Sequence, residues 1–371
     1  MTHITENVRM RIMLLIPAFS GGGAEKQCIF LANALAERDD ADVFLVHFHE
    51  GVNYSLINRS IVKTFRLETT SNYNPGLALK LAKLIRLLRP DVVFSWLHAS
   101  DVFTWLARPL SRGFSWAVAE RNSWYPKELR YLIRELAALR SDVVISNSAK
   151  GDVYWSKRGL PSGRRRVVDN ILPSCWFERG LAAPTRATVA YAGRMEEQKC
   201  ISRLIEAFIH LAQRRPEISF RVAGEGSQRP KVQASIEASG LTNITLEDFQ
   251  KDVKSFFEAS TVFVNISRHE GKPNTVIENL AIGNRVVLSR IPEHIELVGE
   301  NYPFLVDCDA GAEEVSAMID RAAITPVSTE ELREIHERFG PMRAAAVANH
   351  YISIFRQIRS LDIKAIAAGA K

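Results

Sequence analysis

The chain of 371 residues lacks the features that define several large protein classes. Its four cysteines lie far apart, without the paired spacing of zinc sites, which indicates a reducing compartment and no disulfide framework. No apolar run reaches the roughly 18–20 residues of a membrane-spanning helix. The apolar stretch near the start follows polar residues and leads into a glycine loop, so we expect a first strand there and no signal sequence.

Apolar, β-branched strands alternate with helical patterns along the chain, which predicts an α/β fold with parallel sheets covered on both faces. The length suits two domains, with a boundary near Pro173–Pro184. In the first half we expect strands near residues 10–17, 42–48, 91–95, 115–119 and 142–145, with helices near 24–37, 76–88, 100–108, 127–140 and 147–158. In the second half we expect strands near residues 188–192, 218–223, 243–246, 261–266, 285–289 and 303–306, and only helices after Thr325.

Positive charge is concentrated in the first half of the chain. Residues 1–175 contain 24 Lys and Arg against 16 Asp and Glu, whereas residues 176–371 contain 24 against 26. The first half is therefore expected to meet an anionic partner. No nucleic-acid-binding motif is present, so an anionic membrane face or a diphosphate-bearing substrate is the alternative that the sequence favours.

The segment from Arg268 to Gly283 carries the most chemical information. A buried strand is expected before it, and Pro273 suits the first turn of a helix. Main-chain N–H groups at such a helix start favour a phosphate. Glu270 and Glu278, with seven residues between them, would then flank a bound phosphate compound and contact its hydroxyl groups. Two solvated helix carboxylates are the alternative explanation of this spacing.

Two other segments have the composition of phosphate-binding loops. Arg194 and Lys199 are two cations five residues apart that follow a strand ending at Gly193, where guanidinium and ammonium groups can bind phosphate oxygens. Glycine-rich turns follow two other strands, and they contain Gly21, Gly22 and Gly23 in the first half and Gly224 and Gly226 in the second.

Taken together, these segments resemble the retaining glycosyltransferases of family 4, from about Ile12 to Val298. The resemblance rests on the Glu-x7-Glu spacing, the G-R-x4-K element and the S-G-G-A-E-type loop. It implies the GT-B fold, in which two Rossmann-like doubly wound domains face each other across a deep cleft. Residues 1–175 would bind the acceptor, residues 176–340 the nucleotide sugar, and the helix in residues 341–371 would return to the N-terminal domain. Cys200 departs from the family, which has glycine after the lysine.

The resemblance also implies roles for individual residues. Glu270, Arg194 and Lys199 would be catalytic, with Glu270 on the donor sugar and the two cations on the diphosphate. The donor-binding set would be Glu278, Asn274, Thr275, Gly271, Gly224, Gly226, Gly21, Gly22 and Gly23, with main-chain amides of Asn274 and Thr275 on the phosphate. A front-face mechanism with retention of configuration is expected. No metal or other cofactor is expected, because the cations would neutralise the departing diphosphate in place of a metal ion.

The first domain departs from the family in the loop after the expected strand at 115–119. Many members carry a histidine there that contacts the donor sugar, and Arg121 takes its place, with His98 as a possible substitute. Lys127, Arg130 and Arg134 recur at helical spacing beside leucines, which predicts a basic face for acceptor phosphate or lipid headgroups. An ordinary solvated surface explains the same pattern. We expect a cytoplasmic protein, peripheral on the inner face of the plasma membrane.

The expected activity is that of a hexosyl- or N-acetylhexosaminyltransferase acting on a polyprenyl-diphosphate-linked or other glycolipid acceptor in polysaccharide biosynthesis. UDP is favoured over GDP on the resemblance to polymer-building enzymes, but neither base, sugar, acceptor nor oligomeric state can be inferred from the residues. Two alternatives share the fold: a sugar-nucleotide 2-epimerase and a non-catalytic nucleotide-sugar-binding protein. A nicotinamide dehydrogenase is disfavoured because Lys26 breaks the dinucleotide glycine fingerprint.

Overall fold

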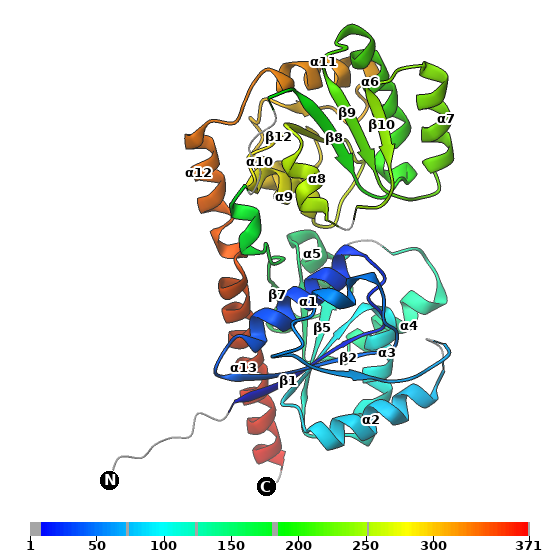
Figure 1. Ribbon diagram of the computed structural model, residues 1–371. Helices are drawn as coiled ribbons and strands as arrows, with labels where there is room; N and C mark the ends of the chain where they lie inside the picture. Colours follow the sequence, from blue (N-terminus) through cyan, green and yellow to red (C-terminus); the bar gives the residue numbers. More distant parts are fainter. Residues whose placement is uncertain (1–8, 72–73, 123–124, 180–184, 251, 370–371) are drawn as a thin grey trace. The chain divides into compact units, whose positions relative to one another are not determined.

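The computed structural model describes residues 9–71, 74–122, 125–179, 185–250 and 252–369, and it divides into two compact units (Figure 1). Residues Met1–Ile171 and Pro341–Lys371 form unit 1, and Leu172–Gly340 form unit 2. Residues 180–184 of the expected domain boundary lie outside the described residues.

Unit 1 is built on a seven-stranded parallel sheet with the order β3-β2-β1-β4-β5-β6-β7. Two of these strands were not expected from the sequence. Both strands, β3 and β7, lie at the edges of the sheet, are short and contain no fully buried residue, so they lack the continuous apolar run of a buried strand. The strands are β1 Met10–Ile16, β2 Ala41–His47, β3 Lys63–Arg66, β4 Val92–Trp96, β5 Ser115–Glu120, β6 Val143–Ser146 and β7 Arg165–Val167.

Helices cover both faces of this sheet (Figure 1). Alternate residues of β1 point to opposite faces: Ile12 and Leu14 pack with α1 and α13, whereas Met13 and Leu15 pack with α2 and α3. Tyr351 of α13 lies against Phe94 of β4, with ring centroids 5.5 Å apart. The helices are α1 Gly23–Ala36, α2 Gly76–Leu88, α3 Leu97–Ala107, α4 Leu129–Ala138, α5 Ala149–Lys157 and α13 Ala344–Gly369.

Unit 2 repeats the design with a six-stranded parallel sheet of order β10-β9-β8-β11-β12-β13. Its strands are β8 Thr188–Ala192, β9 Ser219–Ala223, β10 Ile244–Glu247, β11 Val262–Asn265, β12 Arg285–Ser289 and β13 Leu305–Val306. Its helices are α6 Ile201–Arg214, α7 Arg229–Ser239, α8 Val253–Glu258, α9 Asn274–Ala281, α10 Pro292–Val298, α11 Ala312–Ala323 and α12 Thr329–Arg338. One face of α6 packs on the sheet through Leu204, Ile205 and Phe208, as its helical spacing predicts.

Each sheet reverses its strand order once, between β1 and β4 in unit 1 and between β8 and β11 in unit 2. In wound α/β sheets, ligands bind outside the carboxyl ends of the strands at such a switch point. The fold therefore directs attention to the loops that follow β8 and β11. These loops contain the three residues predicted to be catalytic.

Candidate active site

Glu270, in the loop after β11, is 7% exposed, and one of its two carboxylate oxygens receives all of its hydrogen bonds. Oε1 accepts from Lys199 Nζ at 2.5 Å, from Ser267 Oγ at 2.7 Å and from Asn265 Nδ2 at 3.2 Å. Oε2 has no hydrogen-bond partner within the described residues. Because a carboxylate can accept about four hydrogen bonds, Oε2 keeps the capacity to bind the hydroxyl groups of a ligand.

Lys199, from the loop after β8, reaches Glu270 because two hydrogen bonds join this loop to the loop after β11. The N–H of Arg268 donates to the carbonyl of Gln198 at 2.9 Å, and the side chain of Gln198 donates to the carbonyl of His269 at 2.8 Å. Burial opposes ionisation of Glu270, but the Lys199 ammonium and the Ser267 hydroxyl together hold its pKa below the ordinary value. The acid is therefore a carboxylate at neutral pH.

Arg194, the second predicted cation, is exposed, and its guanidinium has no partner within the described residues. Its main chain is nevertheless fixed, because its carbonyl accepts from the Tyr191 hydroxyl at 2.9 Å. An unpaired guanidinium on a fixed loop at the switch point is available to an anion. The structure thus gives the two cations different states: Lys199 neutralises an acid, whereas Arg194 faces solvent.

The glycines of the loop after β9 support the loop that carries Arg194. Gly224 and Gly226 have positive φ values of 138° and 151°. A Cβ atom would lie 2.0 Å from the Gly193 carbonyl oxygen at the first position and 2.5 Å from that of Met195 at the second. Only glycine permits this close approach of two backbones. These contacts explain the two glycines by packing, and whether they also touch the donor stays a prediction.

The helix α9 begins at Asn274, where an anion-binding set of amides is predicted. The amide of Asn274 donates to the Lys272 carbonyl at 2.9 Å, and its predicted contact with the phosphate stays a prediction. The amide of Thr275 has no acceptor within the described residues and fits the prediction. Gly271 and Glu278 are partly exposed on either side of this helix start.

Sequence reasoning missed Asn265 and Ser267, which hold Glu270 in place. Both are fully or almost fully buried, and the Ser267 hydroxyl lies 2.6 Å from Asn265 Oδ1 as well as 2.7 Å from Glu270. The available signal was a polar residue at the last position of an otherwise apolar strand and a second polar residue two positions further on. Such residues at the carboxyl end of a parallel strand are frequent ligands or supports of a site.

The glycine loop of unit 1 binds its own acid. Glu25, in the first turn of α1, accepts hydrogen bonds from the main-chain amides of Ser20 and Gly22. A Cβ atom at Gly22 would lie 2.2 Å from Glu25 Oε2, so the loop closes tightly over this carboxylate. Burial raises the pKa of Glu25. The amides predicted at Gly21, Gly22 and Gly23 to meet a phosphate are thus partly occupied by a residue of the chain.

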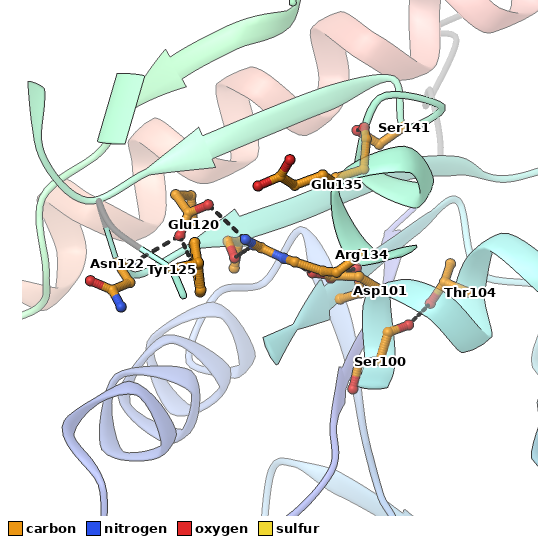
Figure 2. A network of polar contacts seen from close by, with 12 residues as sticks. Ser100, Asp101, Thr104, Glu120, Asn122, Tyr125, Arg134, Glu135 and Ser141 are labelled. Atoms are coloured by element: carbon orange, nitrogen blue, oxygen red, sulfur yellow. Dashed lines mark hydrogen bonds and ion pairs between the residues drawn. The ribbon is translucent and has the colours of Figure 1, made fainter. Parts of the chain in front are cut away.

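Arg134 is not part of an exposed basic face, and this prediction is wrong. Its side chain is 2% exposed, and it donates to Asp101 and to Glu120, each at 2.8 Å (Figure 2). Glu120 also accepts from the main chain of Asn122 at 2.9 Å and from the Tyr125 hydroxyl at 2.6 Å. The arginine faces inward because two acids on β5 and α3 require a cation there.

Arg121 and His98 lie near the carboxyl ends of β5 and β4 in unit 1. The Arg121 guanidinium stacks 3.9 Å from the ring of Trp96 and donates to Asn170 at 3.1 Å and to the Tyr351 hydroxyl at 2.8 Å. These contacts give Arg121 a packing role. Burial and the nearby arginine charges lower the pKa of His98, so its imidazole is neutral.

The exposed face of α4 is apolar. Leu129, Leu132 and Leu136 are 71%, 53% and 51% exposed, at spacings of three and four residues. Arg130 is exposed beside them but already pairs with Glu128 at 2.7 Å, and Lys127 precedes the helix. Within the part of the chain that the structure describes, no helix combines the length and apolarity needed to cross a membrane.

Comparison with known proteins agrees with this geometry. Residues 21–172 match the profile of "Glycosyltransferase Family 4", and residues 186–322 match that of "Glycosyl transferases group 1". The chain therefore belongs to the family 4, group 1 glycosyltransferases, whose members take the sugar from a nucleotide sugar.

Two curated relatives illustrate this membership. A lipopolysaccharide core biosynthesis glycosyltransferase of Rhizobium meliloti is 25% identical over 90% of this chain and 95% of its own length. An α-1,4-N-acetyl-D-galactosaminyltransferase of Campylobacter jejuni that extends an undecaprenol-diphosphate-linked glycan is 24% identical over 81% of this chain and 85% of its own.

Solved structures match in fold. The Anabaena protein HepE, crystallised with UDP and glucose, superposes with a TM-score of 0.79 at 16% identity, over 94% of this chain and all of that one. The trehalose-6-phosphate synthase OtsA gives a TM-score of 0.73 at 12% identity over 94% of this chain and 99% of its own. The predicted fold class is thereby confirmed: two parallel α/β sheets in a GT-B arrangement of the chain.

Proposed function

We propose that this glycosyltransferase moves a hexosyl or N-acetylhexosaminyl group from a UDP-sugar to a lipid-linked glycan, with retention of the anomeric configuration. The observation that carries the proposal is the state of Glu270: Oε1 is anchored by three donors, one of them the Lys199 ammonium of the neighbouring loop, and Oε2 is left open. Such a site suits a ligand with hydroxyl groups next to a diphosphate. Of the two relatives named above, one belongs to lipopolysaccharide core biosynthesis and the other extends an undecaprenol-diphosphate-linked glycan, which favours a lipid-linked glycan as the acceptor.

The proposed reaction uses electrostatic stabilisation by groups already in place. Arg194, Lys199 and the Thr275 amide stabilise the negative charge that grows on the departing diphosphate. Glu270 accepts hydrogen bonds from hydroxyl groups of the donor sugar, and Glu278 from those of the ribose. The acceptor hydroxyl attacks the face from which the diphosphate leaves, and a phosphate oxygen takes its proton. No covalent enzyme intermediate and no metal are part of this scheme.

Binding of the donor requires Lys199 to change partners. Its ammonium lies 2.5 Å from Glu270 Oε1 and neutralises this acid. We infer that the diphosphate draws the ammonium away and that sugar hydroxyls replace it at Glu270. A lysine suits this exchange because its ammonium is a compact charge on a flexible stem, whereas a guanidinium fork is fixed by its geometry.

A panel of nucleotides tests the donor. UDP, GDP, UDP-glucose, UDP-N-acetylglucosamine and GDP-mannose would be compared by thermal shift, because a ligand that binds the folded state raises Tm by mass action. We expect a rise with the uridine compounds. Arg194→Ala should abolish it, whereas the matched control Lys231→Ala, which removes an exposed cation of α7, should not. A larger rise with GDP compounds would reassign the base, and no rise with any of them would refute a donor site here.

For the acceptor side, we propose that α4 docks on an anionic bilayer. The leucine face of α4, made of Leu129, Leu132 and Leu136, is exposed and flanked by Lys127, in the unit with the excess of positive charge. Apolar residues that enter the interface beside cations that attract anionic headgroups favour such a surface. This replaces the expected basic face, since Arg134 is buried.

Co-sedimentation with phosphatidylglycerol vesicles tests the docking. Replacing the three leucines of α4 by serine should abolish binding, while replacing Leu79 and Leu87, the exposed leucines of α2, should reduce it less. Vesicles of phosphatidylcholine alone should bind weakly, because the charge of the surface is then missing. Equal binding of wild type and the serine variant would remove the proposal.

A further inference from the structure

A chain of hydrogen bonds runs behind Glu270 through two elements that the donor-binding residues do not include. His294 Nδ1, on α10, lies 2.8 Å from the carbonyl oxygen of Ser289 at the end of β12. The Ser289 hydroxyl donates to the carbonyl of Ser267 at 2.6 Å. The Ser267 hydroxyl lies 2.7 Å from Glu270 Oε1. The chain therefore connects α10 and β12 to the carboxylate that is proposed to hold the sugar.

The direction of each hydrogen bond follows from chemistry. A carbonyl oxygen only accepts, so His294 Nδ1 must carry a hydrogen and the neutral ring has its lone pair on Nε2. Nε2 is buried and has no partner within the described residues. Ser289 uses its hydroxyl hydrogen on Ser267, so its oxygen, 3.3 Å from the same ring nitrogen, is at most a second acceptor. The single hydroxyl hydrogen of Ser267 is shared between Glu270 Oε1 at 2.7 Å and Asn265 Oδ1 at 2.6 Å, and Asn265 in turn donates to Glu270.

The whole chain is enclosed. Ser267, Ser289 and His294 are each 0% exposed, so none of them meets solvent or a ligand directly. Burial lowers the pKa of His294, and the positive charge of Lys199 lowers it further. The negative charges of Glu270 and Glu293 oppose this shift but do not reverse it, so the ring is neutral. Keeping polar groups in such a place is costly unless each is satisfied, which argues that the arrangement serves the site above it.

We propose that Ser289 and His294 are positioning residues that hold the Ser267–Glu270 loop so that Glu270 presents its open oxygen to the donor sugar. The inference rests on the proposed function of Glu270. A positioning role differs from a general stabilising role in what it affects. In the proposed function the diphosphate is bound by Arg194 and Lys199, on the other loop, and only the sugar is held by Glu270. Loss of the chain should therefore weaken recognition of the sugar and leave recognition of UDP intact.

The experiment measures the dissociation constants of UDP and of the UDP-sugar that gives the largest thermal shift, by calorimetry on each variant. The ratio of the two constants isolates the contribution of the sugar. With the ratio taken as the Kd of the UDP-sugar divided by the Kd of UDP, Ser289→Ala and His294→Leu should each raise it about tenfold, while the Kd of UDP stays unchanged. Tenfold corresponds to the loss of about one hydrogen bond between a sugar hydroxyl and the charged Glu270. His294→Asn should restore most of the ratio, because its amide N–H can occupy the place of Nδ1–H.

Ser260→Ala is the matched control. Ser260 is also 0% exposed and donates to a main-chain carbonyl, that of Phe256 at 3.0 Å, but it lies just before β11, at the end away from Glu270. It should lower Tm to a similar extent and leave the ratio unchanged. A ratio in Ser289→Ala equal to that in Ser260→Ala, or an Asn variant as impaired as the Leu variant, would overturn the inference alone. A wild-type protein that bound no nucleotide sugar would overturn the proposed function and this inference together.

Discussion

Two buried carboxylates, Glu120 in unit 1 and Glu270 in unit 2, each bind a cation, and the differences between them are informative. Glu120 is the last residue of β5, Glu270 lies in the loop after β11, and each binds a cation from another element. Glu120 uses both oxygens: Oε1 accepts from Asn122 and Tyr125, and Oε2 accepts from Arg134 and from the Trp155 indole at 2.8 Å. Glu270 uses only one.

The cations that pair with the two carboxylates also differ in how many partners they have. Arg134 is 2% exposed and is held by a second acid, Asp101, so the Glu120 cluster is complete (Figure 2). Lys199 is 14% exposed and pairs only with Glu270 among the described residues. A buried ion pair is therefore not by itself a sign of a functional site. Hydrogen-bonding capacity that the protein leaves unused, beside a cation that can move, separates the Glu270 site from the structural cluster.

Removing the arginine of the complete cluster should have the largest effect. Arg134→Met leaves two buried carboxylates without a cation, and we expect a loss of about 3–5 kcal/mol in the free energy of unfolding. Urea denaturation would measure it. Arg130→Met on the same helix is the control, since its exposed pair with Glu128 contributes only about 0–1 kcal/mol. Equal effects of the two substitutions would contradict the structural role.

Removing the charge of the incomplete cluster should affect catalysis and spare the fold. Glu270→Gln should reduce sugar transfer about 10²–10³-fold, the size found for removal of one preorganised polar group, with Tm close to that of the wild type. The control is Glu258→Gln, which breaks another buried Glu–Lys pair in the same unit, with Lys254. It should lower Tm and leave activity per folded molecule unchanged. Substantial transfer by Glu270→Gln would remove the assignment.

The two clusters should also respond to pH with opposite signs. Burial raises the pKa of Asp101 to about 6, so its contribution to stability is present below its unfolded value of about 3.9 and is lost as pH rises through 6. The lowered pKa of Glu270 acts the other way, because its contribution is present at neutral pH and is lost in acid. Stability of Asp101→Asn relative to wild type should therefore rise between about pH 4 and pH 7. A pH-independent difference would contradict the assignment.

The sequence predicts the elements of the fold well because parallel strands buried on both faces are continuous apolar runs. The helix at 76–88 has the predicted bounds, and all six expected strands of the second half are present. Edge strands such as β3 escape prediction since their polar residues face solvent, as in a loop. Helix starts are less well predicted: α3 begins at Leu97, three residues early, in a left-handed conformation with φ of 68° that spacing does not reveal.

The site is predictable only in part, because a side chain's direction depends on what lies beneath it. The motif places Glu270 near Lys199, and the structure brings them together. On α4, by contrast, the inward arginine and the outward leucines reverse the usual pattern. Asp101 and Glu120, which cause the reversal, lie on other elements, 33 and 14 positions away along the chain. No local spacing contains this information.

The smallest predicted effect concerns the loop of Lys199. Cys200, directly after the lysine, adopts a left-handed conformation with φ of 50°, where a residue with a Cβ atom is strained by about 1–2 kcal/mol. Glycine relieves the strain but loses about 0.5–1 kcal/mol through the freedom of the unfolded chain. Cys200→Gly should therefore stabilise unit 2 by at most about 1.5 kcal/mol, measurable as a small rise in Tm. The matched substitution Cys308→Gly, at a position without positive φ, should lower Tm. A rise in Tm with both substitutions, or with neither, would show that the backbone at Cys200 is not strained.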